Sequence, residues 1–158
     1  MFAFWQIAFL LSVAIHNVSE ARNLPAWVNK HRNGLPRMIT ATNPGFARAT
    51  FAVTLLCAVV TIAAILSGAG SLGLQVLCGF ALIMCVNALI PHLALSLWLR
   101  DPMPGLVSGI GLVLPTGLVV LTKTYQKAAL SSEQMFTTVP MIAIALLIGL
   151  PLLLRFTR

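Results

Sequence analysis

The chain has 158 residues, of which 59% are hydrophobic and only 8% are charged. A soluble domain usually carries about 25% charged residues, so the composition argues against a soluble globular protein and excludes a disordered one. The net charge of +7 does not indicate a nucleic-acid partner, because a few Lys and Arg among so many apolar residues usually mark membrane orientation. The sequence therefore predicts an all-α membrane protein with one polytopic domain, residues 1–158.

Five apolar stretches meet the requirement of about 20 residues for a helix that crosses a bilayer core. We expect a bundle of about five transmembrane helices, at residues 2–18, 46–66, 72–99, 102–121 and 135–154.

Three helix-start signals support these boundaries. Asn43-Pro44 and Asp101-Pro102 match an N-cap followed by proline at the first helical position. The segment from Ser131 to Gln134 matches a capping box. The prolines inside the later helices are interpreted as kinks: Pro115, Pro140 and Pro151.

Residues 19–45 are expected to form an interfacial loop. Within it, residues 25–32 could form a short helix that ends at Gly34. Trp27 with flanking basic residues suits the headgroup zone of a membrane, so this helix is expected to pack at the membrane surface.

The Lys and Arg residues of the loops predict the orientation. With five spans and the N-terminus outside, eight of the ten Lys and Arg fall on the cytoplasmic side, and the opposite orientation reverses this bias. We therefore expect the N-terminus outside, the C-terminus in the cytoplasm, and a place among the lipids of the cell inner membrane.

Ionisable groups inside membrane helices are costly and point to function. His16 and Glu20 are four residues apart, which places both on one face of the first helix. Asn87 and His92 lie in the second half of the third helix, and Pro91 between them should bend it. Both histidines lie about 10 Å from the cytoplasmic edge. If the first and third helices touch, these residues form one site.

This set suits two kinds of chemistry. His16, Glu20 and His92 are suitable ligands for a divalent metal such as Zn, Fe, Mn or Ni. Without a metal, Glu20 and His92 could act as a proton-transfer pair. Asn87 would be a ligand or an orienting hydrogen-bond partner, so all four residues are catalytic candidates.

Structural roles remain open for the same residues. Glu20 could pair with Arg22 or with Arg100, and Asn87 could hold two helices together. His31 lies in a basic loop and is interpreted as a surface residue.

Two further features are interpreted as packing. Gly105 and Gly109 form a GxxxG pattern that permits close helix contact, either within the chain or in a homo-oligomer. Three cysteines lie inside apolar runs without a CxxC spacing and are expected to be small buried hydrophobes: Cys57, Cys78 and Cys85.

The segment His16-Asn17-Val18-Ser19-Glu20, followed by Leu24-Pro25-Ala26-Trp27, resembles the signature of the HXXEE domain family of small membrane proteins. That signature has a histidine followed by two adjacent glutamates and a Pro-x-Trp-like segment. The order of Asn87, His92 and Pro104-Gly105 further along the chain is also similar to the family, and the resemblance spans about residues 9–121.

The resemblance implies a membrane-embedded metal or acid–base site but no particular substrate. One departure stands out, because Ser19 replaces the first glutamate and only Glu20 is kept. If the family site needs both carboxylates, the chemistry here would be altered or lost.

The first functional hypothesis is a membrane enzyme with a cytoplasm-facing site that acts on a lipophilic or amphipathic small molecule. Hydrolysis, isomerisation and cyclisation all remain open. The alternative is a non-catalytic helper or assembly subunit whose polar cluster holds helices together. A transporter is a third hypothesis, which the nearly complete lack of polar residues in helices 46–66 and 135–154 disfavours.

Overall fold

The computed structural model describes residues 2–35 and 45–155, with side chains up to residue 149. These residues form five helical rods and no strand, as the all-α prediction requires. The third, fourth and fifth rods each contain a π-helical turn, labelled η. In chain order the rods are α1 (Phe2–Lys30); α2 (Gly45–Ser67); α3 (Leu72–Asn87), η1 (Ala88–Ala94) and α4 (Leu95–Leu99); α5 (Leu106–Ser108), η2 (Gly109–Val113) and α6 (Leu114–Gln126); and η3 (Gln134–Thr138) with α7 (Val139–Arg155).

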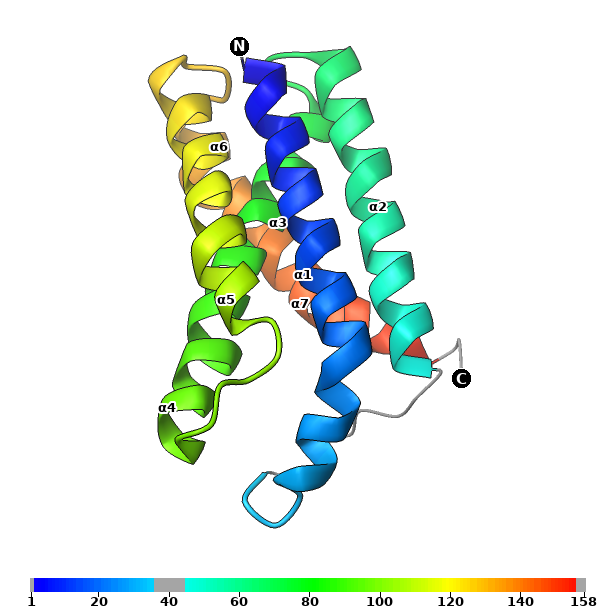
Figure 1. Cartoon of the computed structure of the whole chain (residues 1–158). Coiled ribbons are helices and arrows are strands. Elements are labelled where there is room, and N and C mark those ends of the chain that lie inside the picture. Colours follow the sequence, from blue (N-terminus) through cyan, green and yellow to red (C-terminus); the bar gives the residue numbers. More distant parts are fainter. Residues whose placement is uncertain (1, 36–44, 156–158) are drawn as a thin grey trace.

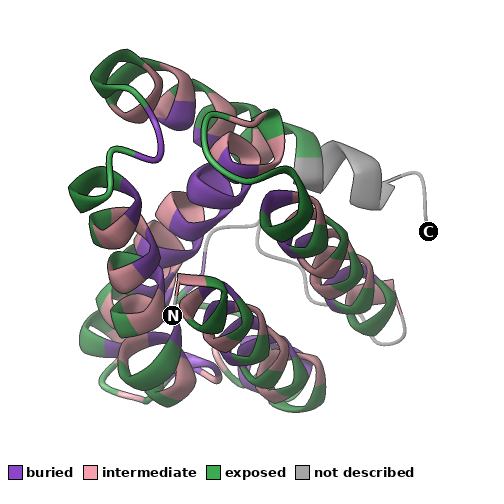
Figure 2. Ribbon diagram, turned by 90° about the horizontal axis from the view of Figure 1, so that it is seen from above, coloured by how far each residue is buried: buried purple, intermediate pink, exposed green. Residues whose placement is uncertain are grey.

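The rods pack as a bundle around α3. Helices α2, α6 and α7 all contact α3, and α1 packs against α2 and α6. Figure 1 shows α1, α2, α3 and α6 running roughly side by side, while α7 crosses behind them obliquely. Seen from above, the buried residues of the rods face one another and the exposed residues face outward (Figure 2).

The first four rods are each long and apolar enough to cross a membrane. The fifth is also an apolar helix. Large hydrophobic side chains, among them Phe51, Leu66 and Val107, are exposed on the outer surface of the bundle. Such an outer surface matches lipid better than water, because soluble monomers rarely expose large contiguous apolar areas.

Each π-helical turn accompanies a proline. Pro91 lies inside η1, whereas Pro115 and Pro140 follow η2 and η3 within two residues. Proline has no backbone N–H to donate to the carbonyl four residues earlier and its ring clashes with that carbonyl, so a local π turn accommodates it. Two of the prolines interpreted as kinks, Pro115 and Pro140, therefore follow a local widening of the helix, whereas Pro151 lies inside α7.

The first helix is longer than expected. Instead of giving way to a loop after residue 18, α1 continues without a break through Pro25 to Lys30. The expected separate surface helix is the last part of α1. The extension is stable because Leu24, Trp27 and Val28 form one apolar stripe, which packs in a small cluster with Met103.

The fourth helix starts later than expected. Asp101-Pro102 does not cap it, because the Asp101 carboxylate accepts a hydrogen bond from Lys30 Nζ at 2.9 Å. The helix begins at Leu106, after Gly105 with a φ of 92°.

The other two start signals differ in outcome. Ser131 Oγ accepts a hydrogen bond from the Gln134 backbone N–H, and Gln134 Oε1 accepts one from the Ser131 N–H. The predicted capping box is therefore confirmed. Asn43-Pro44 lies outside the described residues.

The main core lies between the helices and includes Phe9, Leu77 and Phe80. As expected, the cysteines are buried and unpaired by disulfides. One polar contact that the sequence did not indicate ties α1 to α2, where Asn17 Nδ2 donates to Thr54 Oγ1 at 2.8 Å.

Candidate functional site

Helix α1 contributes two residues of the site. His16 and Glu20 lie one turn apart and project from the same face, with His16 Nε2 3.7 Å from Glu20 Oε1. The His16 side chain is fully buried, and the Glu20 side chain is 13% exposed. The four-residue spacing therefore places both side chains on one face of the helix, as the sequence predicted.

The third rod contributes the other two predicted residues at its π-helical turn. Asn87 precedes η1, and His92 lies inside it directly after Pro91. His92 is 1% exposed. Ser96, which the sequence analysis missed, accepts a hydrogen bond from the Met103 backbone N–H and donates to the His92 carbonyl, so it holds this turn against the following loop.

The four predicted residues meet in space. Glu20 Oε1 lies 2.9 Å from His92 Nε2. Asn87 Nδ2 lies 3.2 Å from His92 Nε2 and 3.5 Å from His16 Nε2. The two imidazole rings stand edge to face with centroids 4.8 Å apart. Side chains of the first and third rods therefore meet, which is the condition that the sequence set for a single site.

A third segment, which the sequence analysis did not assign to the site, completes it. His16 Nδ1 lies 3.1 Å from the Gly105 carbonyl oxygen and 3.2 Å from Ser108 Oγ. A carbonyl only accepts, so Nδ1 carries the hydrogen in the neutral ring and Nε2 turns its lone pair toward Glu20. This is the arrangement in which a histidine can bind a metal.

Gly105 covers the two rings. A Cβ at this position would lie 2.8 Å from His92 Cε1 and 2.9 Å from His16 Cε1, and the φ of 92° also favours glycine. Gly109 packs against Ala88 and is likewise buried. The GxxxG pattern therefore serves packing within the chain, which is one of the two roles that the sequence left open.

The three ionisable residues could together hold a metal ion. One ligand atom from each of His16, Glu20 and His92 lies within 4.8 Å of the others. The two histidines differ, however, because His92 Nδ1 is buried and has no hydrogen-bond partner among the described residues. Because no hydrogen bond at Nδ1 fixes which nitrogen of His92 carries the hydrogen, Nε2 suits two roles. It can bind a metal through its lone pair, or it can carry the hydrogen and donate it to Glu20.

The polar cluster borders a cavity. Glu20 and Asn87 line a space of about 230 Å³ between α1, α2, α3 and α7. Its other walls are largely apolar and include Phe46, Val53 and Met84. A small apolar group or part of a chain can therefore approach the carboxylate.

The sequence left open an ion pair between Glu20 and either Arg22 or Arg100. Glu20 contacts the two histidines, and no ion pair joins it to Arg22 or Arg100 in the part of the chain that the structure describes. His31 lies apart from the site, where its Nε2 is 3.3 Å from Asp101 Oδ2. Hydrogen bonding by Lys30 lowers the pKa of the Asp101 carboxyl below its ordinary value.

Fold and site together define an apolar helical bundle with a buried His/Glu/His cluster. The chain matches, over residues 7–120, the family described as "Protein of unknown function with HXXEE motif". Since the match covers most of the chain, this protein belongs to the HXXEE family, as the resemblance predicted.

One curated relative is similar over nearly the whole length. The chain is 24% identical over 147 residues to "Uncharacterized protein YrkK" of Bacillus subtilis (strain 168), which covers 93% of this chain and 91% of the relative. No solved structure matches this chain significantly.

Proposed function

We propose that this chain is a membrane-embedded enzyme that acts on a lipophilic or amphipathic substrate through His16, Glu20, Asn87 and His92. The observation that carries the proposal is the 2.9 Å contact between Glu20 Oε1 and His92 Nε2 inside a largely apolar bundle. Burying a carboxylate and two imidazoles is costly, and such groups inside a membrane commonly serve a function.

We favour a metal-binding form of this site, with His16, Glu20 and His92 as ligands. Two nitrogens and one carboxylate oxygen suit Zn, Fe, Mn or Ni. The Gly105 carbonyl supports this role, because it accepts the hydrogen of His16 Nδ1 and so leaves the lone pair on Nε2, the form of the ring that binds a metal. A bound divalent ion would acidify water or polarise a carbonyl of the substrate.

The residues can also work by acid–base catalysis without an ion. A proton shared between Glu20 Oε1 and His92 Nε2 can be delivered to a substrate or taken from it. Asn87 Nδ2 lies close enough to both histidines to orient them. The cavity beside Glu20 and Asn87 gives a substrate group a way to reach the carboxylate.

The cellular location is part of the same proposal. Four long apolar helices support insertion in a membrane. The bias of Lys and Arg supports a cell inner membrane location with the N-terminus outside, the C-terminus in the cytoplasm and the site near the cytoplasmic side.

The first test is the metal content of the detergent-purified protein, measured by elemental mass spectrometry after incubation with Zn, Fe, Mn or Ni. We expect about one ion per chain. His16→Ala and His92→Ala should each lose it, whereas His31→Ala, a histidine outside the cluster, should keep it. A folded wild-type protein without metal would overturn the metal-binding form.

The alternative, a non-catalytic helper whose cluster only holds helices together, makes a different prediction. The contact of Asn87 with His16 favours it, since this contact joins α1 to the third rod. In that case His92→Ala should lower the thermal stability strongly and wild-type protein should bind no ion. If His92→Ala instead keeps its thermal stability and loses the metal, the cluster is a metal site and not only a structural contact, as the enzyme proposal requires.

A further inference from the structure

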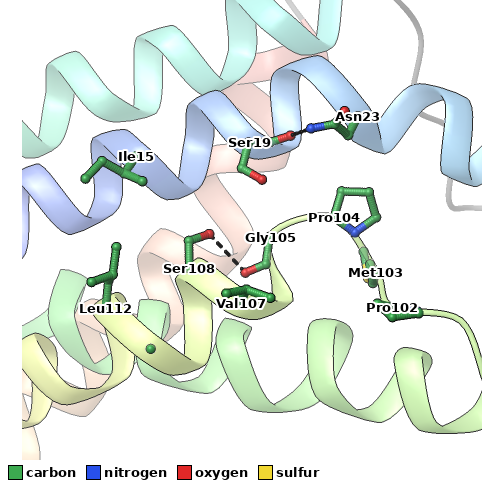
Figure 3. A pocket seen from close by; sticks show the side chains of 11 residues that line it. Ile15, Ser19, Asn23, Pro102, Met103, Pro104, Gly105, Val107, Ser108 and Leu112 are labelled. Atoms are coloured by element: carbon green, nitrogen blue, oxygen red, sulfur yellow. Dashed lines mark hydrogen bonds between the residues drawn. The ribbon is translucent and has the colours of Figure 1, made fainter.

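A larger groove lies on the other side of α1 from the cavity described above. Its volume is about 700 Å³, within the range of about 300–1,000 Å³ that is usual for ligand pockets. It runs between α1 and residues 102–112, and Figure 3 shows the side chains that line it.

The groove has polar groups but no charged ones. Ser19, Asn23 and Ser108 are its polar side chains, and none of the described residues that line it is ionisable. Asn23 Nδ2 donates to the Ser19 carbonyl at 3.0 Å, and Ser108 Oγ lies 3.2 Å from the Gly105 carbonyl oxygen (Figure 3). A charged head group would find no partner of opposite charge here, whereas a hydroxyl or ester can bond to these groups.

Three apolar side chains of the groove are exposed on the outer surface of the bundle, whereas Met103 is buried. Ile15 is 54% exposed, Val107 83% and Leu112 39%. If the bundle is embedded as proposed, these residues contact lipid, so the groove opens sideways into the bilayer. An aliphatic chain in the groove would lie against Ile15 and Leu112.

The groove adjoins the polar cluster. Gly105 and Ser108 line it, and the same two residues contact His16 Nδ1. A head group bound at this end would therefore be separated from His16 only by a glycine and a hydroxyl.

Ser19 connects the groove with the family motif. It occupies the position of the first glutamate of HXXEE, and it lines the groove rather than joining the three residues that could hold a metal. The replacement of that glutamate therefore removes a charge from the groove and leaves the His16–Glu20–His92 cluster complete.

We infer that this groove binds a long-chain amphiphile with an uncharged hydrogen-bonding head, such as an alcohol or an ester, which enters from the bilayer. The inference rests on the proposed membrane location and goes beyond the proposed function, because it assigns a second binding site beside the polar cluster. The head group lies at Ser19, Asn23 and Ser108, and the chain lies between Ile15 and Leu112.

Photolabelling can test this inference in vesicles of phosphatidylethanolamine and phosphatidylglycerol. The probe is a long-chain alcohol that carries a diazirine, and the labelled residues are mapped by peptide mass spectrometry. The blocking variant is Gly111→Phe, because Gly111 lines the groove and an added Cβ there meets no atom within 4 Å. The matched control is Gly149→Phe, which also has open space but lies outside the groove.

We expect the label to concentrate in residues 15–23 and 102–112. Gly111→Phe should reduce that labelling about tenfold, which corresponds to a modest loss of binding free energy, and Gly149→Phe should leave it unchanged. The carboxylic acid and the quaternary ammonium compound of equal chain length should compete at least about tenfold more weakly than the unlabelled alcohol.

Labelling that spreads evenly over the outer surface, or that survives in Gly111→Phe, would overturn the inference. Equal competition by the charged compounds would overturn the choice of an uncharged head. Metal content measured on the same samples tests the metal site and the groove separately. Protein that is labelled in the groove but holds no metal would contradict only the metal-binding site.

Discussion

Glu20 Oε1 lies 2.9 Å from His92 Nε2, so a carboxylate of α1 meets an imidazole of η1 across a separation of more than 70 residues in the chain. His16 and Asn87 flank this contact, and Gly105 covers both rings. Three features shape the site around this contact: the four-residue spacing of His16 and Glu20 in α1, the π-helical turn at Pro91 and the missing side chain at Gly105. Each feature can be altered separately.

Replacing Glu20 by Gln should preserve the fold and weaken metal binding. The amide keeps nearly the same shape and can still bond to His92, but it loses the negative charge that a divalent ion requires. We expect the affinity for Zn to fall at least about tenfold, measured by calorimetric titration in detergent. Glu133→Gln removes an exposed carboxylate outside the cluster and is the matched control. Equal affinity in both variants would contradict Glu20 as a ligand.

Replacing Gly105 by Ala should damage both stability and the site. The new Cβ would press on His16 and His92, and the left-handed backbone conformation disfavours any side chain. We expect a loss of about 1–3 kcal/mol in the free energy of unfolding together with weaker metal binding. Gly111→Ala, where the Cβ meets open space, should be neutral or stabilising by about 0.5–1 kcal/mol. Equal free energies of unfolding for Gly105→Ala and Gly111→Ala would show that the fold does not need a glycine at position 105.

The ion pair between Lys30 and Asp101 should make stability depend on pH at the end of α1. Hydrogen bonding by Lys30 lowers the folded-state pKa of Asp101, so the pair stabilises the fold above the ordinary carboxyl pKa of about 4. This contribution is lost as the pH falls through the depressed pKa. Asp101→Asn should therefore lower the melting temperature slightly at neutral pH, with a difference from wild type that shrinks in acid.

Salt provides a second check on this pair, because Lys30 is exposed and Asp101 is partly exposed, so that dissolved ions screen their charges. High salt should reduce the difference between wild type and Asp101→Asn at neutral pH. A difference that grows toward acid pH would have the wrong sign for a carboxyl with a lowered pKa.

Restoring the family glutamate by Ser19→Glu should change the groove and spare the metal site. The carboxylate would stand among uncharged groups, so labelling by the long-chain alcohol should decrease and competition by the quaternary ammonium compound should increase. Metal stoichiometry, measured by elemental mass spectrometry, should stay unchanged. A gain in metal affinity would instead place residue 19 among the ligands, and Ser19→Ala is the control for loss of the hydroxyl alone.

The sequence by itself determined the helical class of the protein and the candidates for its site. Long apolar stretches predict their own helices, because hydrophobic length and proline or serine signals act within a segment. Polar residues are so scarce in these helices that His16, Glu20, Asn87 and His92 stood out before any contact was known. The capping box at Ser131 was predicted for the same reason, since its two hydrogen bonds are local.

Only the tertiary structure decided where helices stop and which segments complete the site. Helix α1 continues past the expected end because its last turns pack near Met103 and Lys30 pairs with Asp101. Gly105 reads as a helix-packing glycine in the sequence, yet it covers two histidines that lie far away along the chain. Ser19 lies on the face of α1 that lines the groove with residues 102–112, whereas Glu20 contacts the two histidines. These outcomes depend on contacts between remote segments, whose energies no local pattern of residues encodes.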